Sequence, residues 1–224
     1  MTTYSLEIQF DLRGLAAPLA AAEQVVIVKQ TSPSVEPVVW VAFDPLLVNA
    51  VTWTDEYSVY GSRSGLEEDG VIGIDWILPA VGGETYLFQD GQFGSWGANL
   101  PSNEYGIGNL DQNFMLLTAG LAQASSGSGG DAVSALNAII LPFNDEVVFT
   151  PSEVVQVFTL ANATNGRVIS SVPSDALLVD LTENTSQVIQ YSDDNGQFVL
   201  GPLPLPSARS GLPDPTRSPA SGLC

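Results

Sequence analysis

The eight residues SLEIQFDL, at positions 5–12, carry the pattern that decides the fold class. Leu6, Ile8, Phe10 and Leu12 alternate with polar residues, four matches in four to a period of two. Successive side chains of a β-strand point to opposite faces, so this alternation is typical of a strand with one buried face. The stretch therefore predicts an opening β-strand whose apolar face contributes to a core.

Further runs rich in β-branched and aromatic residues follow at intervals of roughly 10 to 15 residues, which is the rhythm of an all-β sandwich or barrel. Asn195-Gly196, within SDDNGQ, indicates a hairpin because Asn-Gly tolerates the positive φ angles of a tight turn. We therefore predict an antiparallel, jelly-roll-like β-sandwich of about a dozen strands. The main runs are VVIVKQ (25–30), VVWVAF (38–43), NAVTWTDEYSVYGS (49–62), GVIGIDWIL (70–78), ETYLFQ (84–89), EVVFT (146–150), EVVQVFTL (153–160), ALLVDLT (176–182) and SQVIQYS (186–192).

The chain of 224 residues fits one domain, since 45% of its residues are hydrophobic and only 14% are charged. We assign residues 1–200 to a single sandwich with a flexible Gly/Ser loop near 124–131. The preceding stretch, 111–123, fits either a helix or a strand, because an Asp that could cap a helix precedes helix-forming Met and Leu. Residues 201–224 are rich in proline and lack alternation, which predicts a poorly packed tail.

Charge excludes several classes of partner. The chain has 25 acidic and six basic residues, a formal net charge of −19. Such a surface repels phosphate backbones and anionic lipids, so we expect neither a nucleic acid nor an anionic membrane surface as partner. The N-terminus shows no basic or apolar leader, and Cys224 is the only cysteine, so we expect a cytoplasmic protein without an internal disulfide.

Residue content also limits the chemistry. The chain has no histidine, which excludes Ser-His-Asp and Cys-His nucleophilic arrangements and imidazole-based metal sites. The single lysine, Lys29, lies inside an apolar predicted strand. Paired carboxylates could still hydrolyse glycosidic bonds. We expect no cofactor, although these residues could bind calcium, which takes only oxygen ligands. The carboxylate candidates are Asp55, Glu56, Glu67, Glu68, Asp69 and Asp75, although with 25 acidic residues such clusters arise by chance and solvated acids of turns and strands are the favoured explanation.

Two aromatic stretches are candidates for ligand binding. In TWTDEYSVYGS (52–62), alternation places Trp53, Tyr57 and Val59 together in the core, while Tyr60 near the strand end is expected to be more exposed. In QDGQFGSWGANLPSNEYG (89–106), a Gly-rich loop presents aromatic and amide groups. Sugars pack their C–H faces on aromatic rings and bond amides through their hydroxyls. The predicted ligand-binding residues are Trp96, Asn99, Asn103, Tyr105 and Tyr60, and the alternative is that Trp96 folds back onto the sheet.

Several of these stretches together resemble a group of uncharacterised cytosolic β-proteins of mushroom-forming fungi. The resemblance spans most of residues 38–198 and is carried by Trp53, Tyr57, Tyr60 and the run 177–180. It implies a cytosolic β-sandwich and no particular activity. By analogy of fold alone, such fungal proteins are often lectins or defence proteins.

These observations favour a non-catalytic, lectin-like module that binds a glycan or another small molecule through loop aromatics and amides. A self-assembling structural protein, which would be a homo-oligomer, is a second hypothesis because the strands are strongly apolar. A carboxylate-dependent hydrolase is a third. A pore-forming toxin is less compatible with the negative charge, since it would meet anionic lipids unfavourably.

Overall fold

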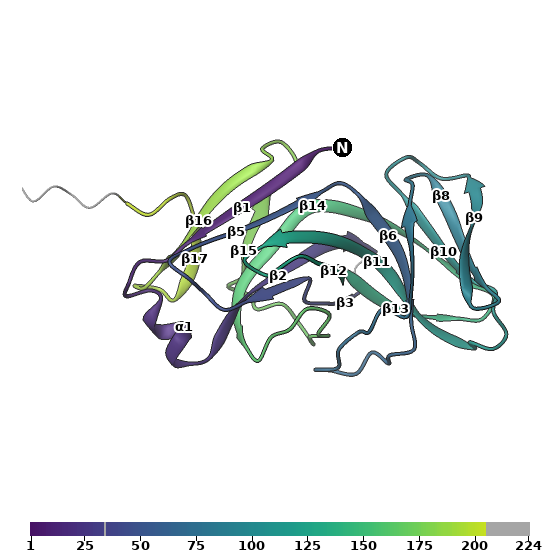
Figure 1. The fold of residues 1–224 in the computed structure, drawn as a ribbon, viewed down its shortest axis with the longest axis horizontal. Helices are drawn as coiled ribbons and strands as arrows, with labels where there is room; N and C mark the ends of the chain where they lie inside the picture. The colour runs from purple at the N-terminus through teal and green to yellow at the C-terminus, as the bar shows by residue number, and fades with distance from the viewer. Residues whose placement is uncertain (34, 205–224) are drawn as a thin grey trace, which may run out of the picture.

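The protein is almost entirely β-structure, as seen in a computed structural model that describes residues 1–33 and 35–204 (Figure 1). The one α-helix within these ranges, α1 (Ala16–Ala20), has five residues and follows the first strand. It holds Pro18, which is tolerated only near a helix N-terminus. No helix in the described ranges is long and apolar enough to cross a membrane.

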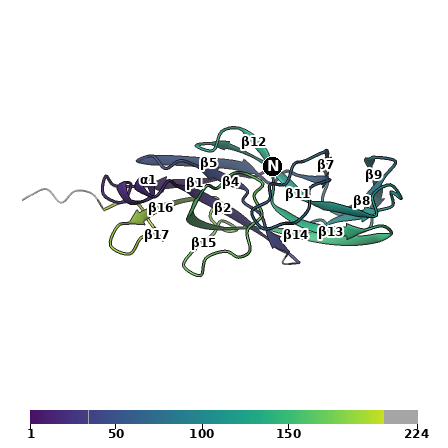
Figure 2. The same ribbon diagram turned by 90° about the horizontal axis from the view of Figure 1, so that it is seen from below.

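Two curled sheets are packed together, and Figure 2 shows them edge-on as two layers. The larger has the order β17-β16-β1-β5-β11-β13-β3, with further strands paired at its side. Its ten strands are β1 (Thr3–Gln9), β3 (Glu36–Pro37), β5 (Val48–Thr54), β6 (Tyr57–Ser62), β7 (Trp76–Ala80), β11 (Leu116–Gly127), β12 (Ala132–Ala135), β13 (Asn137–Pro142), β16 (Ser186–Ser192) and β17 (Gln197–Leu200).

The smaller sheet has the order β4-β2-β14-β10-β8-β9, with one more strand beside β14. It ends at one side of the molecule in β8 and β9, which form a hairpin at the opposite end from α1 (Figure 1). Its seven strands are β2 (Glu23–Ser32), β4 (Val41–Phe43), β8 (Glu84–Gln89), β9 (Gln92–Ala98), β10 (Tyr105–Asn109), β14 (Asp145–Ala161) and β15 (Leu177–Asp180).

Both sheets are mixed, which differs from the antiparallel sandwich predicted from sequence. β1 pairs with β16 in parallel, and β10 pairs with β8 in parallel, while the other pairings are antiparallel. Parallel pairing needs a long crossover, and spacing along a sequence does not reveal which distant strands become neighbours. The prediction of an all-β fold built from two packed layers is confirmed, and the jelly-roll-like arrangement stays a prediction. The predicted count of about a dozen strands is too low, because the described residues form 17 strands, several of them only two to four residues long.

The alternation of the opening stretch is reproduced in β1. Leu6, Ile8 and Phe10 are buried, but Leu12 is 79% exposed because the strand ends at Gln9. β1 lies between β5 and β16, so both of its edges are hydrogen-bonded. The side chains buried along it therefore belong to the interior of the sheet and contribute to the main core.

The main core fills the space between the two layers. It joins apolar side chains of β1 and β5 in the larger sheet to those of β2 and β14 in the smaller one. Trp40 is completely buried there, and its ring meets that of Trp53 edge to face, with centroids 5.2 Å apart. Burying this area supplies most of the driving force that holds the layers together.

Two long connections cover the outer faces of the sheets. Residues 63–75 bring Ile72 against Tyr60 and β11, and residues 162–176 bring Ile169 against β2 and β14. An ion pair joins the two connections, in which the Arg167 guanidinium of residues 162–176 lies 2.6 Å from the Asp69 carboxylate of residues 63–75. As a result the middle of β2 and of β11 is buried on both faces, and β2 accordingly contains the continuous apolar run Val25–Val28.

β11 resolves the stretch that fitted either helix or strand. Residues 116–127 are extended, so the prediction of a flexible loop at 124–131 differs from the structure, in which only 128–131 form the turn. Gly127 ends the strand with φ +121°, where an added Cβ would lie 2.1 Å from the Ala50 carbonyl oxygen. Small residues in this stretch therefore mark a close approach of strands as well as a turn.

Leu121 and Leu116 of β11 offer a matched test of the core. Leu121 is fully buried and Leu116 is 66% exposed. We expect Leu121→Ala to lower the free energy of unfolding by about 2–5 kcal/mol, because it removes buried contacts and leaves a cavity. Leu116→Ala should change it by less than about 0.5 kcal/mol. Urea unfolding of both variants measures this, and equal effects would contradict the assignment of Leu121 to the core.

Candidate functional site

A break in the pairing of β14 with β2 positions the first site. Pro151 is opposite Thr31 and Val155 is opposite Lys29, so three residues of β14 face one residue of β2. Proline lacks an N–H donor and is found in sheets at edges or bulges. The bulge turns Glu153 inward, where its side chain is only 12% exposed. Two separate strands, 146–150 and 153–160, are predicted here from the sequence, whereas the structure has one bulged strand of 17 residues.

Lys29 occupies an inward position of β2, in line with Val25 and Ile27 of the main core. Its side chain has no exposed surface, although an isolated ammonium is costly to bury. Rings surround it, since its Nζ lies 5.0 Å from the centroid of Tyr57 and 5.7 Å from those of Trp40 and Trp53. The nitrogen is therefore held between the two sheets in a largely aromatic shell.

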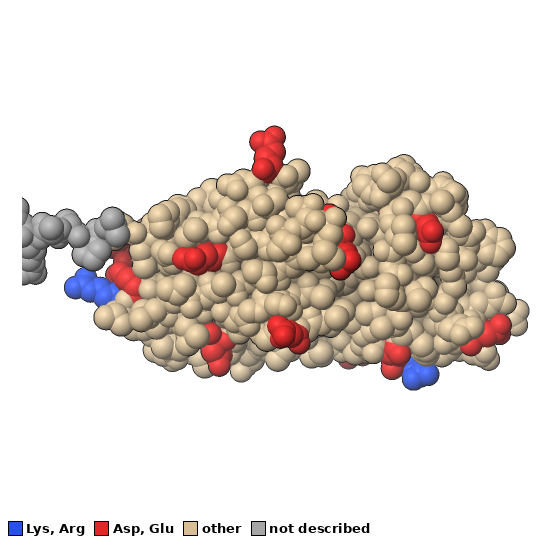
Figure 3. All heavy atoms as spheres, turned by 45° about the horizontal axis from the view of Figure 1, so that its top comes forward, with Lys and Arg blue, Asp and Glu red and all other residues tan. Residues whose placement is uncertain are grey.

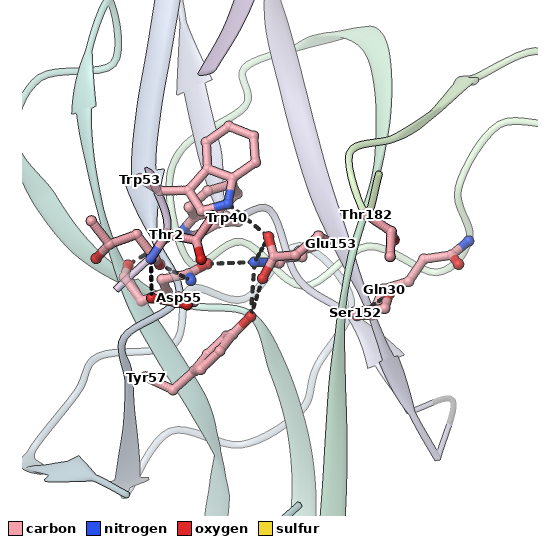
Figure 4. A network of polar contacts seen from close by, with 12 residues as sticks. Thr2, Gln30, Trp40, Trp53, Asp55, Tyr57, Ser152, Glu153 and Thr182 are labelled. Carbon is pink, nitrogen blue, oxygen red and sulfur yellow. Dashed lines mark hydrogen bonds and ion pairs between the residues drawn. The ribbon is translucent and has the colours of Figure 1, made fainter. Parts of the chain in front are cut away.

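The Lys29 ammonium donates to three acceptors, shown by the dashed lines in Figure 4. These are Glu153 Oε2 at 2.7 Å, Gln123 Oε1 at 2.9 Å and the Tyr57 hydroxyl at 3.0 Å. Because an ammonium has three N–H donors, its hydrogen bonding is complete. We call Lys29, Trp53, Tyr57, Gln123 and Glu153 the seam network. The name reflects its position between the layers, because Lys29 and Glu153 belong to the smaller sheet and the other three to the larger one.

Glu153 receives two further bonds from the stretch TWTDEYSVYGS. The Trp53 indole N–H donates to Oε2 at 2.9 Å, and the Tyr57 hydroxyl donates to Oε1 at 2.5 Å. Trp53 and Tyr57 are 3% and 6% exposed, so their predicted placement in the core is confirmed. Their partners could not be predicted from local patterns, because Lys29 and Glu153 lie far away along the chain.

Burial sets the acid–base behaviour of the network. Desolvation lowers the pKa of Lys29 to about 8, against the opposing attraction of Glu153. Desolvation also raises the pKa of Tyr57 well above its usual range, and the nearby Glu153 carboxylate raises it further. Lys29 therefore loses its proton more easily than an exposed lysine, whereas the Tyr57 hydroxyl stays protonated.

A second bulge positions Trp96. Thr85 is opposite Gly97 and Tyr86 is opposite Ser95, so Trp96 is the unpaired extra residue of β9. Its side chain is 73% exposed, which rules out in this structure the alternative in which Trp96 folds back onto the sheet. Gly97 has φ +114°, a conformation that favours glycine, and open space surrounds it. The bulge thus presents a large ring at the free edge of the smaller sheet.

Amide groups lie close to this edge. Asn99 follows β9 directly, is exposed, and accepts a hydrogen bond from the Thr85 hydroxyl at 3.0 Å. Asn103 is exposed on the loop that returns to β10. Gly83 fixes this loop, because it accepts from the Asn99 backbone N–H at 3.0 Å and donates to the Glu104 carbonyl at 2.7 Å. The end of β9 therefore carries one exposed ring and two exposed amides.

Two predicted ligand-binding residues are buried instead. Tyr105 is 7% exposed, with its ring 5.4 Å from that of Tyr57. Tyr60 has no exposed surface, and its hydroxyl donates to the Asn137 carbonyl at 2.6 Å. The expectation of an exposed Tyr60 is wrong because residues 63–75 cover the outer face of its strand. Of the five predicted residues, the structure leaves Trp96, Asn99 and Asn103 exposed, the first on β9 and the other two on the loop that follows it.

Three of the six candidate hydrolytic carboxylates are held by separate structural partners. Asp55 accepts from the Thr2 backbone N–H at 2.9 Å, Asp69 pairs with Arg167, and Asp75 accepts from the Arg63 backbone N–H at 2.7 Å. Within residues 1–33 and 35–204, no three Asp, Glu, His or Cys side chains gather as a metal-binding group. Figure 3 shows one face on which carboxylates stand apart in a largely uncharged surface.

A groove of about 960 Å³ lies beside the β16–β17 hairpin, at the end of the molecule opposite to β8 and β9 (Figure 1). Phe10, Leu47 and Tyr191 contribute apolar walls, and Asp193 and Asp194 contribute acidic ones. This groove holds no residue of the seam network or of the Trp96 edge.

Comparison with known proteins adds no function to any of these sites, because no family model, curated protein or solved structure matches the chain.

Tyr57→Phe tests the seam network. It removes a hydroxyl that donates to Glu153 and accepts from Lys29, and we expect a loss of about 1–3 kcal/mol in unfolding free energy at pH 8. The pKa of Tyr57 is higher in the folded protein than in the unfolded chain. The wild type therefore loses stability as the pH rises above 10, because the phenol then ionises in the unfolded chain but not in the folded protein. The difference between the two proteins should shrink by about 1.4 kcal/mol by pH 11.

Urea unfolding of both proteins at pH 8, 9, 10 and 11 measures this difference. Parallel stability profiles from pH 9 to 11 would contradict the protonated, hydrogen-bonded state assigned to Tyr57.

Proposed function

We propose that the protein is a non-catalytic, lectin-like binding module that holds a neutral glycan at the Trp96 edge. The bulged, 73% exposed Trp96 is the observation that carries the proposal. An exposed indole is an unfavourable surface in water and a favourable platform for the C–H face of a sugar ring. Asn99 and Asn103 would donate to and accept from the sugar hydroxyls, as amides do in polar subsites.

The surroundings of Trp96 support a polar, uncharged ligand. Glu84, beside the bulge, accepts from the Ser95 hydroxyl at 2.8 Å and from the Tyr86 hydroxyl at 3.0 Å. This carboxylate would repel an anion and could accept from a sugar hydroxyl. The net charge of −19 acts against polyanionic partners in the same way. We expect the module to act in the cytoplasm, in line with its single cysteine at position 224.

The alternatives receive less support. A carboxylate hydrolase needs two acids on either side of one bond, roughly 5 to 10 Å apart, and three of the six candidate acids, Asp55, Asp69 and Asp75, are instead held by separate structural partners. Self-assembly into a homo-oligomer would use free strand edges or apolar patches, and β9 and β17 are such edges. Light scattering on the same sample as the binding assay separates self-assembly from glycan binding.

Trp96→Ala tests the proposed site, with Leu178→Ala as control. Leu178 is a 50% exposed apolar residue of β15, outside the Trp96 edge, so its loss removes exposed apolar area without touching that edge. On a glycan array, we expect Trp96→Ala to reduce binding roughly tenfold or more, because a central aromatic contact contributes over 1 kcal/mol. Leu178→Ala should bind as the wild type does.

Loss of binding in both variants, or in neither, would contradict the assignment of the site to Trp96. The array is run with and without calcium, because a fall in binding on chelation would add a metal to the site.

A further inference from the structure

The choice of basic residue in the seam network is unusual for this chain. Five of its six basic residues are arginines, and its single lysine is the one that is fully buried. Arginine is the better residue for a permanent buried ion pair, because its guanidinium keeps its charge and bonds carboxylates in parallel. A lysine amine differs in that it can lose its proton and become a nucleophile.

The partners of Lys29 are those that a nucleophilic amine requires. Gln123 Oε1 is 2.9 Å from Nζ, which places the side-chain amide of Gln123 beside the amine. The Gln123 amide nitrogen donates to the Thr54 carbonyl at 2.6 Å, so the amide group is fixed at both ends. Glu153 Oε2 is 2.7 Å from Nζ and can take its proton. An amine, an amide and a carboxylate therefore meet at one point.

The environment favours reaction between these groups. Lys29 and Gln123 are 2% and 1% exposed, so bulk water has little access to compete as nucleophile. Burial also favours the neutral, nucleophilic form of the amine. Both groups belong to rigid central strands, β2 and β11, which hold them in contact as an intramolecular pair.

We propose that Lys29 and Gln123 form an intramolecular isopeptide bond that covalently joins the two sheets, with Glu153 as the proton carrier. In this reaction Glu153 takes a proton from the Lys29 ammonium, and the freed amine attacks Cδ of Gln123. The new Nζ–Cδ bond forms and the Cδ–Nε2 bond breaks. The departing nitrogen gains one proton from the amine and one from Glu153, so it leaves as ammonium and needs no oxidant, reductant or other reactant.

The product removes the buried cation and leaves the Glu153 carboxylate to be held by neutral donors. The amide that replaces the Lys29 ammonium is neutral, so the desolvation of a cation is removed. Glu153 keeps the Trp53 and Tyr57 donors and gains the new amide N–H in place of the ammonium. The bond would also close a loop between residues 94 positions apart, which restricts the unfolded chain as other cross-links do.

Mass spectrometry of the intact, denatured protein tests this directly. Cross-linking removes one ammonia, so we expect the mass to be about 17 Da below that of the sequence. Trypsin digestion then locates the bond, because an acylated Lys29 is not cleaved. The peptide 14–63 should appear joined to 64–167, and the free peptide 14–29 should be missing. A full mass with free peptide 14–29 would overturn the proposal, as would a loss of about 18 Da placed at Glu153.

Three variants assign the roles, each checked for folding by circular dichroism. Lys29→Arg keeps the charge but removes the nucleophile, and Gln123→Leu removes the electrophile, so both should have the full mass of their sequences. Glu153→Gln keeps the shape but cannot take the proton, and it should stay uncrosslinked or react at least tenfold more slowly. A folded Lys29→Arg or Gln123→Leu protein that still loses ammonia would place the bond elsewhere and overturn the assignment.

Discussion

The burial of one ammonium group between two sheets constrains much of this structure. Lys29 needs three acceptors in a place that water does not reach, and they come from residues far apart along the chain: Tyr57, Gln123 and Glu153. Each acceptor must arrive from a different strand in the right register. The Pro151–Val155 bulge positions Glu153 for this role, and the Trp53 and Tyr57 side chains both donate to the carboxylate there.

Period-two patterns were enough to predict an all-β protein and many of its core residues. Leu6, Ile8 and Val59 are buried as expected, because a strand with one covered face imposes alternation on its own sequence. The predicted exposure of Tyr60 is wrong, because residues 63–75, which form a connection and not a strand, cover the outer face of β6. Coverage of that kind depends on where a distant segment packs, which no local pattern encodes.

The site residues show the same division. Trp96 was identifiable from its glycine neighbours, yet its exposure depends on a bulge that shifts the register by one residue. Glu153 had a local signal in Pro151, which interrupts an otherwise regular strand. Lys29 had a signal as well, since a charge inside an apolar run requires a partner. The identity of that partner required the three-dimensional structure.

The parallel pairing of β1 with β16 has a consequence for how the protein is made. Ser5 lies opposite Ser186, so β1 cannot complete its hydrogen bonding until β16, 181 residues further along the chain, has left the ribosome. Pairings of such long range are slow to form and leave strand edges open in the meantime. Until β16 emerges, this edge of β1 is available to other nascent chains, so the demand for chaperone protection should last from the synthesis of β1 to that of β16.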